Sequence, residues 1–130
     1  MSKRVLIIDD DPSIRKLYAR TIRAEDREVT TVASGAEAME ILSQHGADLI
    51  LLDLNMPGMD GAATLKMIRE AHRTIPIFII TGFLDVFLER LKVLRQAGIQ
   101  FEVLNKPVEK EHLRAAVSSV LDGPVELSQT

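Results

Sequence analysis

Five short segments are each typical of a β-strand: four are apolar runs, and one is rich in β-branched residues. They are Arg4–Ile8, Glu28–Val32, Leu49–Leu52, Ile77–Ile80 and Phe101–Leu104. The run Leu49–Leu52 leads straight into Asp53 and then into a Pro-Gly loop. We therefore expect Asp53 at the carboxyl end of a central strand, where open α/β sheets bind their ligands.

Amphipathic segments separate these runs and predict five helices. The helices are expected from Pro12 to about Ala24, from Ser34 to near Gly46, from Asp60 to before Thr74, from Phe83 to Gln96, and around Leu113 to Leu121. Asp11-Pro12 and the Ser34/Glu37 capping box are start signals, and Gly98 lies just past a predicted end. In the first helix, Ile14, Leu17, Tyr18 and Ile22 are expected to face inward.

Strands that alternate with helices predict an α/β fold, with a five-stranded parallel sheet covered by helices on both faces. Right-handed crossovers and the doubly wound strand order 2-1-3-4-5 place the switch point between the first and third strands. On this order Asp9 and Asp10 become neighbours of Asp53. Thr81 and Lys106 end their strands at the same edge.

Composition narrows the classes of protein to consider. The 130 residues form one domain, 46% hydrophobic and 27% charged, with a net charge of −3. That charge argues against a nucleic-acid surface. The absence of cysteine excludes disulfides and thiol catalysis. No apolar run is long enough to span a bilayer, so we expect no membrane contact and a cytoplasmic location.

The five converging polar residues suit phosphoryl chemistry. Three carboxylates close together repel one another unless a cation lies among them, and Mg²⁺ fits oxygen ligands of this kind. A carboxylate can act as a nucleophile and form an aspartyl phosphate. Lys106 and Thr81 would offer a cation and a hydroxyl to phosphoryl oxygens. The alternative is a polar cluster at the strand ends with no chemistry.

Four segments of the chain resemble the receiver domain of two-component response regulators, in particular single-domain chemotaxis regulators. They are Val5–Pro12, Asp48–Gly61, Ile79–Gly82 and Leu104–Pro107. The resemblance implies a flavodoxin-like (βα)5 fold, a receiver domain over residues 1–123, and a flexible tail over residues 124–130. It also implies a phosphorelay switch rather than an enzyme.

The resemblance implies a role for each site residue. Asp53 matches the phospho-acceptor, Asp10 a direct Mg²⁺ ligand, and Asp9 a ligand that usually acts through water. The backbone carbonyl of Asn55 matches the third protein ligand. Lys106 matches the lysine that pairs with the phosphoryl group, and Thr81 matches the hydroxyl that moves toward it. The Lys106-Pro107 peptide bond matches one that is usually cis.

The implied partners are a histidine kinase or a histidine phosphotransfer protein, and a downstream protein. The downstream protein would bind the face made by the fourth helix, fifth strand and fifth helix, and a homodimer is possible. A basic stretch surrounds the first predicted helix and forms either a solvated face or a kinase docking surface. Its residues are Arg15, Lys16, Arg20, Arg23 and Arg27. No output segment is expected after Leu121, so the effect would come through protein contacts.

Two features depart from the family pattern. Val103 stands where the family usually has Tyr or Phe, which puts the usual aromatic switch in doubt, and Phe101 is the only nearby replacement. The segment from Phe83 to Gln96 is rich in apolar residues. Either this helix presents an apolar patch to a partner or to a second copy, or it packs more core.

Three other functions compete with the switch. A Mg²⁺-dependent phosphatase with an aspartyl nucleophile would usually need a carboxylate where Asn55 stands. An interaction module that works without phosphorylation would not need Asp9, Asp10, Asp53, Thr81 and Lys106 together. A receiver module cut from a larger regulator or kinase keeps the same chemistry.

Overall fold

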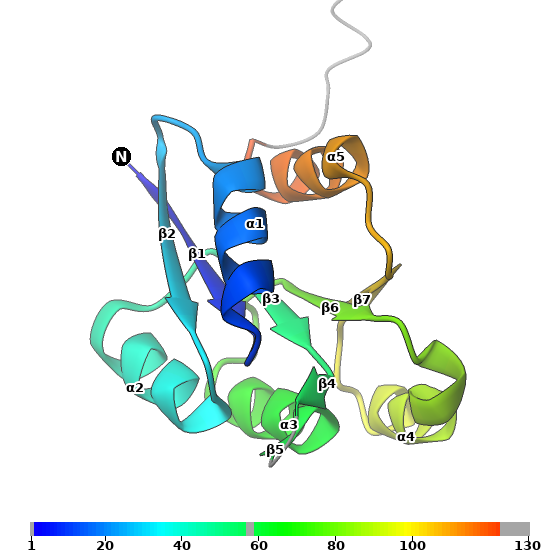
Figure 1. Ribbon diagram of the computed structural model, residues 1–130. Helices are drawn as coiled ribbons and strands as arrows, with labels where there is room; N and C mark the ends of the chain where they lie inside the picture. The colour runs from blue at the N-terminus through cyan, green and yellow to red at the C-terminus, as the bar shows by residue number, and fades with distance from the viewer. Residues whose placement is uncertain (1, 57–58, 123–130) are drawn as a thin grey trace, which may run out of the picture.

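A parallel sheet of five strands lies at the centre of the protein (Figure 1). The structure is a computed structural model and describes residues 2–56 and 59–122. The strands are β1 (Lys3–Ile8), β2 (Arg27–Val32), β3 (Leu49–Asp53), β6 (Ile77–Thr81) and β7 (Glu102–Asn105). Their spatial order is β2-β1-β3-β6-β7, which confirms the predicted order 2-1-3-4-5.

Five helices cover the two faces of this sheet (Figure 1). They are α1 (Pro12–Ile22), α2 (Gly35–His45), α3 (Gly61–Ala71), α4 (Leu84–Gln96) and α5 (Lys110–Leu121). Buried residues of α1 and α5 share one core cluster, and those of α2, α3 and α4 share the other. Among the residues placed in the structure, no helix is long and apolar enough to cross a membrane.

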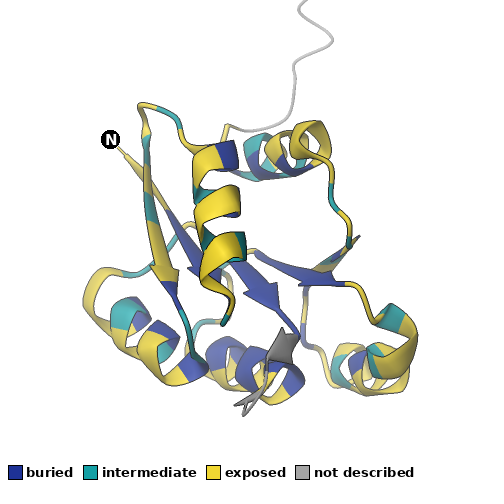
Figure 2. Ribbon diagram, viewed as in Figure 1, coloured by how far each residue is buried: buried dark blue, intermediate teal, exposed yellow. Residues whose placement is uncertain are grey.

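Both faces of the central strands are buried, which explains why the sequence shows continuous apolar runs there rather than alternation. Every residue of β3 and β6 is buried (Figure 2). Along β1, Val5 and Ile7 face the α1–α5 side, whereas Leu6 and Ile8 face the opposite side. The sheet is therefore a rigid platform for the residues at its carboxyl edge.

The predicted helix starts are confirmed by their caps. Asp11 Oδ1 accepts from the backbone N–H of Ser13 at 2.8 Å. Ser34 Oγ accepts from Glu37 N–H at 3.2 Å, and the Glu37 carboxylate accepts from Ala33 N–H. These caps fix the residues at which α1 and α2 begin.

The first helix differs from its prediction in two details. It ends at Ile22 rather than near Ala24, because Arg23 is extended and Arg27 Nη1 donates to the Ile22 carbonyl oxygen. The expected inward position of Leu17 is wrong, since that side chain is exposed. Tyr18, Thr21 and Ile22 form the buried face instead.

α4 divides its apolar side chains between the core and the surface. Leu91 is its single buried residue. Val86, Leu88 and Val93 are exposed, as is Phe83 just before the helix. Leu84, Phe87 and Leu94 are half-buried and pack against the core, so α4 both adds to the core and presents an apolar surface.

Candidate functional site

Three carboxylates meet at the carboxyl edge of the sheet. Asp53 ends β3, and Asp9 and Asp10 follow β1. Ile8 pairs with Leu52, so the parallel register carries Asp9 alongside Asp53. One oxygen from each of Asp9, Asp10 and Asp53 lies within 4.8 Å of the others. The predicted convergence of these three residues is thereby confirmed.

The pKa of the Asp9 carboxyl group is raised in the folded protein. Burial is the main cause that raises its pKa to about 6, and the charge of Asp53 adds to it. The backbone N–H of Asp11, which donates to Asp9 Oδ1 at 2.9 Å, and the charge of Lys106 act in the opposite direction. The other oxygen, Oδ2, is buried without a hydrogen-bond partner.

This arrangement fits a hard divalent cation. A buried carboxylate oxygen without a donor is costly, and a cation among three carboxylates removes both that cost and their mutual repulsion. Oxygen ligands with bound waters are what Mg²⁺ prefers. Asp9, Asp10 and Asp53 could therefore hold Mg²⁺.

Lys106 reaches the cluster from the end of β7. Its Nζ lies 3.5 Å from Oδ1 of Asp53, whose side chain is 5% exposed. The backbone N–H of Lys106 donates to the Thr81 carbonyl oxygen at 2.9 Å, which extends the β6–β7 ladder by one residue. The Lys106-Pro107 peptide bond is cis, as the resemblance implies.

Thr81 completes the set at the end of β6. Its side chain is fully buried, and Oγ1 accepts from the backbone N–H of Phe83 at 3.0 Å. The hydroxyl proton is left to donate to another group. Because Ile80 pairs with Asp53, Thr81 lies next to the acceptor strand and connects it to the start of α4.

A small hairpin that the sequence did not predict follows Asp53. It pairs β4 (Asn55–Met56) with β5 (Met59–Asp60), two strands too short to show a hydrophobic pattern. The predicted Pro57-Gly58 loop lies outside the described residues. The metal-ligand role of the Asn55 carbonyl stays a prediction.

Two residues near the cluster were not predicted as parts of the site. Arg15 Nη1 donates to the backbone carbonyl oxygen of Asp9 at 2.7 Å and so orients the peptide that carries the carboxylate. Burial raises the pKa of Tyr18 to about 12, and the charges of Asp9 and Asp53 add to this increase. Helical spacing assigned Tyr18 to the core, but gave no sign that it senses the acidic cluster.

The position of the usual aromatic switch is occupied by a half-buried Val103 that packs against the core. Phe101 is buried, and the guanidinium carbon of Arg95 lies 4.4 Å from the centre of its ring. Phe101 is therefore held inside the core and does not replace an exposed aromatic at position 103.

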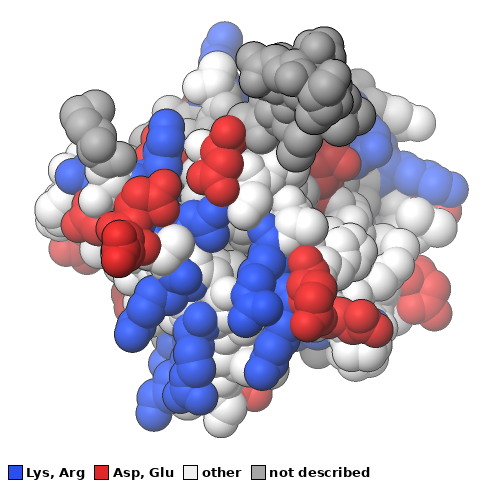
Figure 3. Space-filling model, turned by 90° about the horizontal axis from the view of Figure 1, so that it is seen from above, with Lys and Arg blue, Asp and Glu red and all other residues white. Residues whose placement is uncertain are grey.

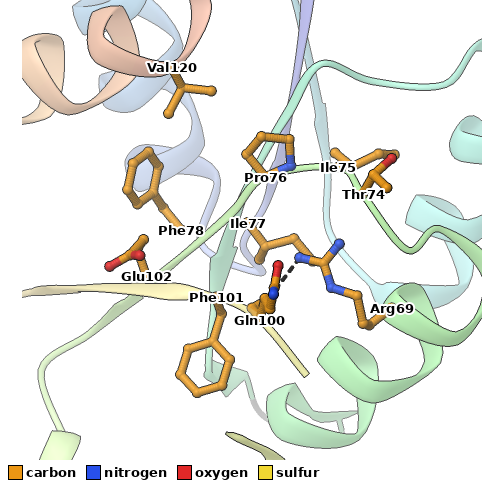
Figure 4. Close-up of a pocket in the computed structure, with 10 residues that line it drawn as sticks. All are labelled: Arg69, Thr74, Ile75, Pro76, Ile77, Phe78, Gln100, Phe101, Glu102 and Val120. Carbon is orange, nitrogen blue, oxygen red and sulfur yellow. Dashed lines mark hydrogen bonds between the residues drawn. The ribbon is translucent and has the colours of Figure 1, made fainter. Parts of the chain in front are cut away.

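A separate hollow of about 220 Å³ lies at the opposite, amino end of β6 and β7 (Figure 4). Phe78, Phe101 and the buried Arg69 are among its lining residues. Arg69 donates to the carbonyl oxygens of His72 and Gln100 at 3.1 and 2.7 Å, and so ties the end of α3 to the start of β7. This hollow is structural in character and distant from the acidic cluster.

Comparison with known proteins gives a consistent result. Residues 5–118 match the family model of the response regulator receiver domain. The chain is 30% identical to sporulation initiation phosphotransferase F of Bacillus subtilis (strain 168), over 93% of this chain and 95% of that protein. It is 36% identical to the DNA-binding transcriptional regulator NtrC of Escherichia coli (strain K12), over 90% of this chain. The chain spans about a quarter of that regulator, 24% of its length.

Solved structures of similar proteins share the fold. Chemotaxis protein CheY4 of Vibrio cholerae superposes with a TM-score of 0.81 at 30% identity, covering 93% of this chain and 100% of that one. The receiver domain of AraT, a response regulator from Geobacillus stearothermophilus, gives a TM-score of 0.78 at 33% identity, covering 99% and 98%.

Proposed function

We propose that this chain, which belongs to the response regulator receiver domain family, accepts a phosphoryl group on Asp53 in a Mg²⁺-dependent reaction. The family is one of signalling domains that act as phosphoryl-acceptor switches. The observation that carries the assignment to Asp53 is its position. Its carboxylate lies beside two further carboxylates and 3.5 Å from the Lys106 ammonium.

The reaction moves a phosphoryl group from a phosphohistidine to a carboxylate. An oxygen of Asp53 attacks the phosphorus, a P–O bond forms, and the P–N bond to the donor imidazole breaks. The imidazole leaves with the electron pair of that bond and takes up a proton from solvent. Bound Mg²⁺ would neutralise charge on the phosphoryl oxygens.

The residues of the chain divide the remaining tasks. Asp9, Asp10 and Asp53, with the Asn55 carbonyl, would hold Mg²⁺. Lys106 is placed to stabilise the negative charge of the transferred group. The chain's own part is thus positioning and electrostatic stabilisation, as expected for phosphoryl transfer.

Thr81 would pass the signal onward. Its hydroxyl can donate to a phosphoryl oxygen while its Oγ1 remains bonded to the N–H of Phe83. A shift of Thr81 toward Asp53 would therefore pull on the first turn of α4. The output would reach a downstream protein, or a second copy of the chain, through the α4–β7–α5 face and its exposed apolar residues, without the aromatic switch at Val103.

The phosphoryl donor would be a histidine kinase or a histidine phosphotransfer protein, met in the cytoplasm. Lys16 and Arg20 of α1 and Arg23 just after it are exposed, and Arg114 of α5 donates to the Thr21 carbonyl oxygen beside them. Lys and Arg side chains gather on one side of the molecule in the view from above (Figure 3). This charge supports the docking interpretation of α1, because an acidic partner surface would be attracted to it.

We assign residues 1–123 to the receiver and expect no direct contact of this part with nucleic acid. The chain matches only 24% of the length of NtrC, which supports a second possibility: the same receiver works as one module of a longer regulator. The acceptor chemistry is identical in both cases.

Intact-mass analysis after incubation with Mg²⁺ and acetyl phosphate tests the proposal. One added phosphoryl mass is expected in the wild type, and none in Asp53→Asn or without Mg²⁺. If small donors fail, a histidine kinase replaces acetyl phosphate. Absence of labelling with both donors, in a folded protein, would refute the switch and leave the apolar surface of α4 as the leading account of function.

A further inference from the structure

An ion pair joins the middle of α4 to the segment that follows the acceptor strand. Arg90 of α4 donates from Nη2 to Oδ2 of Asp60. The other carboxylate oxygen, Oδ1, accepts from the backbone N–H groups of Ala62 and Ala63 at 3.0 and 3.2 Å and so caps α3. Asp60 therefore serves two helices at once. The bond from Arg90 is the largest of the causes that lower its pKa.

The backbone around Asp60 packs closely against the residues that follow Asp53. A Cβ placed on Gly61 would lie 2.4 Å from the Cα of Leu54, so the start of α3 presses directly on the residue after Asp53. Position 60 also pairs with position 55 in the hairpin formed by β4 and β5. The Asp60 backbone is thus tied to the segment that directly follows the acceptor.

α4 is joined to the rest of the site by two polar contacts in addition to its core packing. Leu91 is buried, and Leu84, Phe87 and Leu94 pack half-buried against the same core cluster. The N–H of Phe83, its N-cap residue, donates to Thr81, so a displacement of Thr81 is transmitted directly to the start of the helix. The bond between Arg90 and Asp60 is a second tie, two turns further along α4.

We propose that Arg90 is a positioning residue: its pairing with Asp60 holds α4 in the conformation in which Lys106 pairs with the Asp53 carboxylate, and opposes the conformation that a phosphoryl group favours. The inference rests on the proposed function. In this structure Lys106 Nζ lies 3.5 Å from Asp53 Oδ1, so the Arg90–Asp60 pair and the Lys106–Asp53 contact are present together.

The geometry gives the direction of the effect. When Thr81 is drawn toward a phosphoryl group, α4 follows through Phe83, whereas Asp60 stays with α3. The Arg90–Asp60 ion pair is then lost or weakened, so it stabilises the unphosphorylated conformation more than the phosphorylated one. By linkage, removing the pair must favour the phosphoryl-bound conformation by the same factor. Both side chains are about half exposed, so we expect a factor of about two to five.

The test is a titration with beryllofluoride, a phosphoryl mimic, at saturating Mg²⁺. The fluorescence of Tyr18, the only tyrosine in a chain without tryptophan, reports binding. Arg90→Gln is expected to bind the mimic about two to five times more tightly than wild type. The matched control is Lys92→Gln, which removes the same charge from the same helix by breaking the exposed pair with Glu89, and which should bind as wild type does.

A second variant distinguishes loss of the ion pair from a folding defect and from a change in net charge. Asp60→Ser keeps an oxygen that can cap α3 but cannot pair with Arg90. It is expected to tighten binding as Arg90→Gln does, although the two variants change the net charge in opposite directions. The double variant should gain no more than either single variant, because both remove one interaction.

The outcomes separate the inference from the proposed function. If wild type shows no saturable response that requires both Mg²⁺ and Asp53, the switch itself fails and the role of Arg90 fails with it. If wild type responds but Arg90→Gln and Asp60→Ser bind within the error of wild type, or no more tightly than Lys92→Gln, only the role of Arg90 is overturned. Tighter binding by both variants and a non-additive double variant support it.

Discussion

Replacing Asp9 by Asn should stabilise the metal-free protein, although it removes a predicted Mg²⁺ ligand. The folded protein raises the pKa of Asp9 from 3.8 to about 6, mainly by burial. Folding therefore favours the protonated form, and stability is lost as the pH rises through these values. The Asn side chain keeps an oxygen to accept from Asp11 N–H and carries no charge to desolvate.

The size of the effect follows from the pKa difference. At pH 7 Asp9 is ionised in both the folded and the unfolded chain, and the full difference corresponds to about 3 kcal/mol of lost stability. At pH 4.5 the folded protein keeps its proton and the unfolded chain has partly lost its own, which leaves about 1 kcal/mol. The gain from Asp9→Asn should therefore be about 3 kcal/mol at pH 7 and about 1 kcal/mol at pH 4.5.

The difference in free energy of unfolding between wild type and Asp9→Asn is measured by urea unfolding at pH 7 and pH 4.5, with a chelator present. Repeating the experiment with excess Mg²⁺ should shrink the gain at pH 7, because a ligand that binds the folded state stabilises wild type more than the variant. A variant no more stable than wild type at pH 7, or a gain equal at both pH values, would refute the reasoning.

Three further predictions concern stability and titration. Asp53→Asn should lower the pKa of Tyr18 in an alkaline absorbance titration, because the charge of Asp53 helps to raise it, while burial keeps it above 10. Gly61→Ala should cost about 1–3 kcal/mol in urea unfolding, since its Cβ would meet the Leu54 backbone. Leu91→Ala should cost about 2–4 kcal/mol by the same measurement, because it removes the one buried side chain of α4.

The residues at the ends of the strands allowed most of the candidate site to be predicted from the sequence. Four of the five runs stop directly at a polar residue, namely Asp9, Asp53, Thr81 or Asn105, and a parallel sheet aligns these stops at one edge. Asp9 and Asp53 lie 44 positions apart, yet their convergence required only the strand order. Helix starts could also be predicted from cap residues such as Asp11, because capping depends on neighbours within one turn.

Features that depend on side chains from distant segments could not be predicted. The pairing of Arg90 with Asp60 and the burial of Arg69 have no signature in hydrophobic spacing, since Arg at either position fits an exposed helix face. Leu17 was assigned inward because it fits the helical period, but the orientation of α1 on the sheet decides which residues of that stripe are covered. The two-residue strands of the hairpin are shorter than any periodic pattern.

The strand order also divides the site by local stability. Asp9 and Asp10 follow β1, and Asp53 ends β3; both strands have neighbours on both sides, whereas Lys106 follows β7 at the margin of the sheet. Opening of β7 and α5 alone would remove the lysine and leave the three carboxylates assembled. Hydrogen exchange should then find a partly unfolded state that retains cation binding but has lost phosphoryl transfer. During synthesis the same asymmetry gives the nascent chain its acidic cluster well before its lysine.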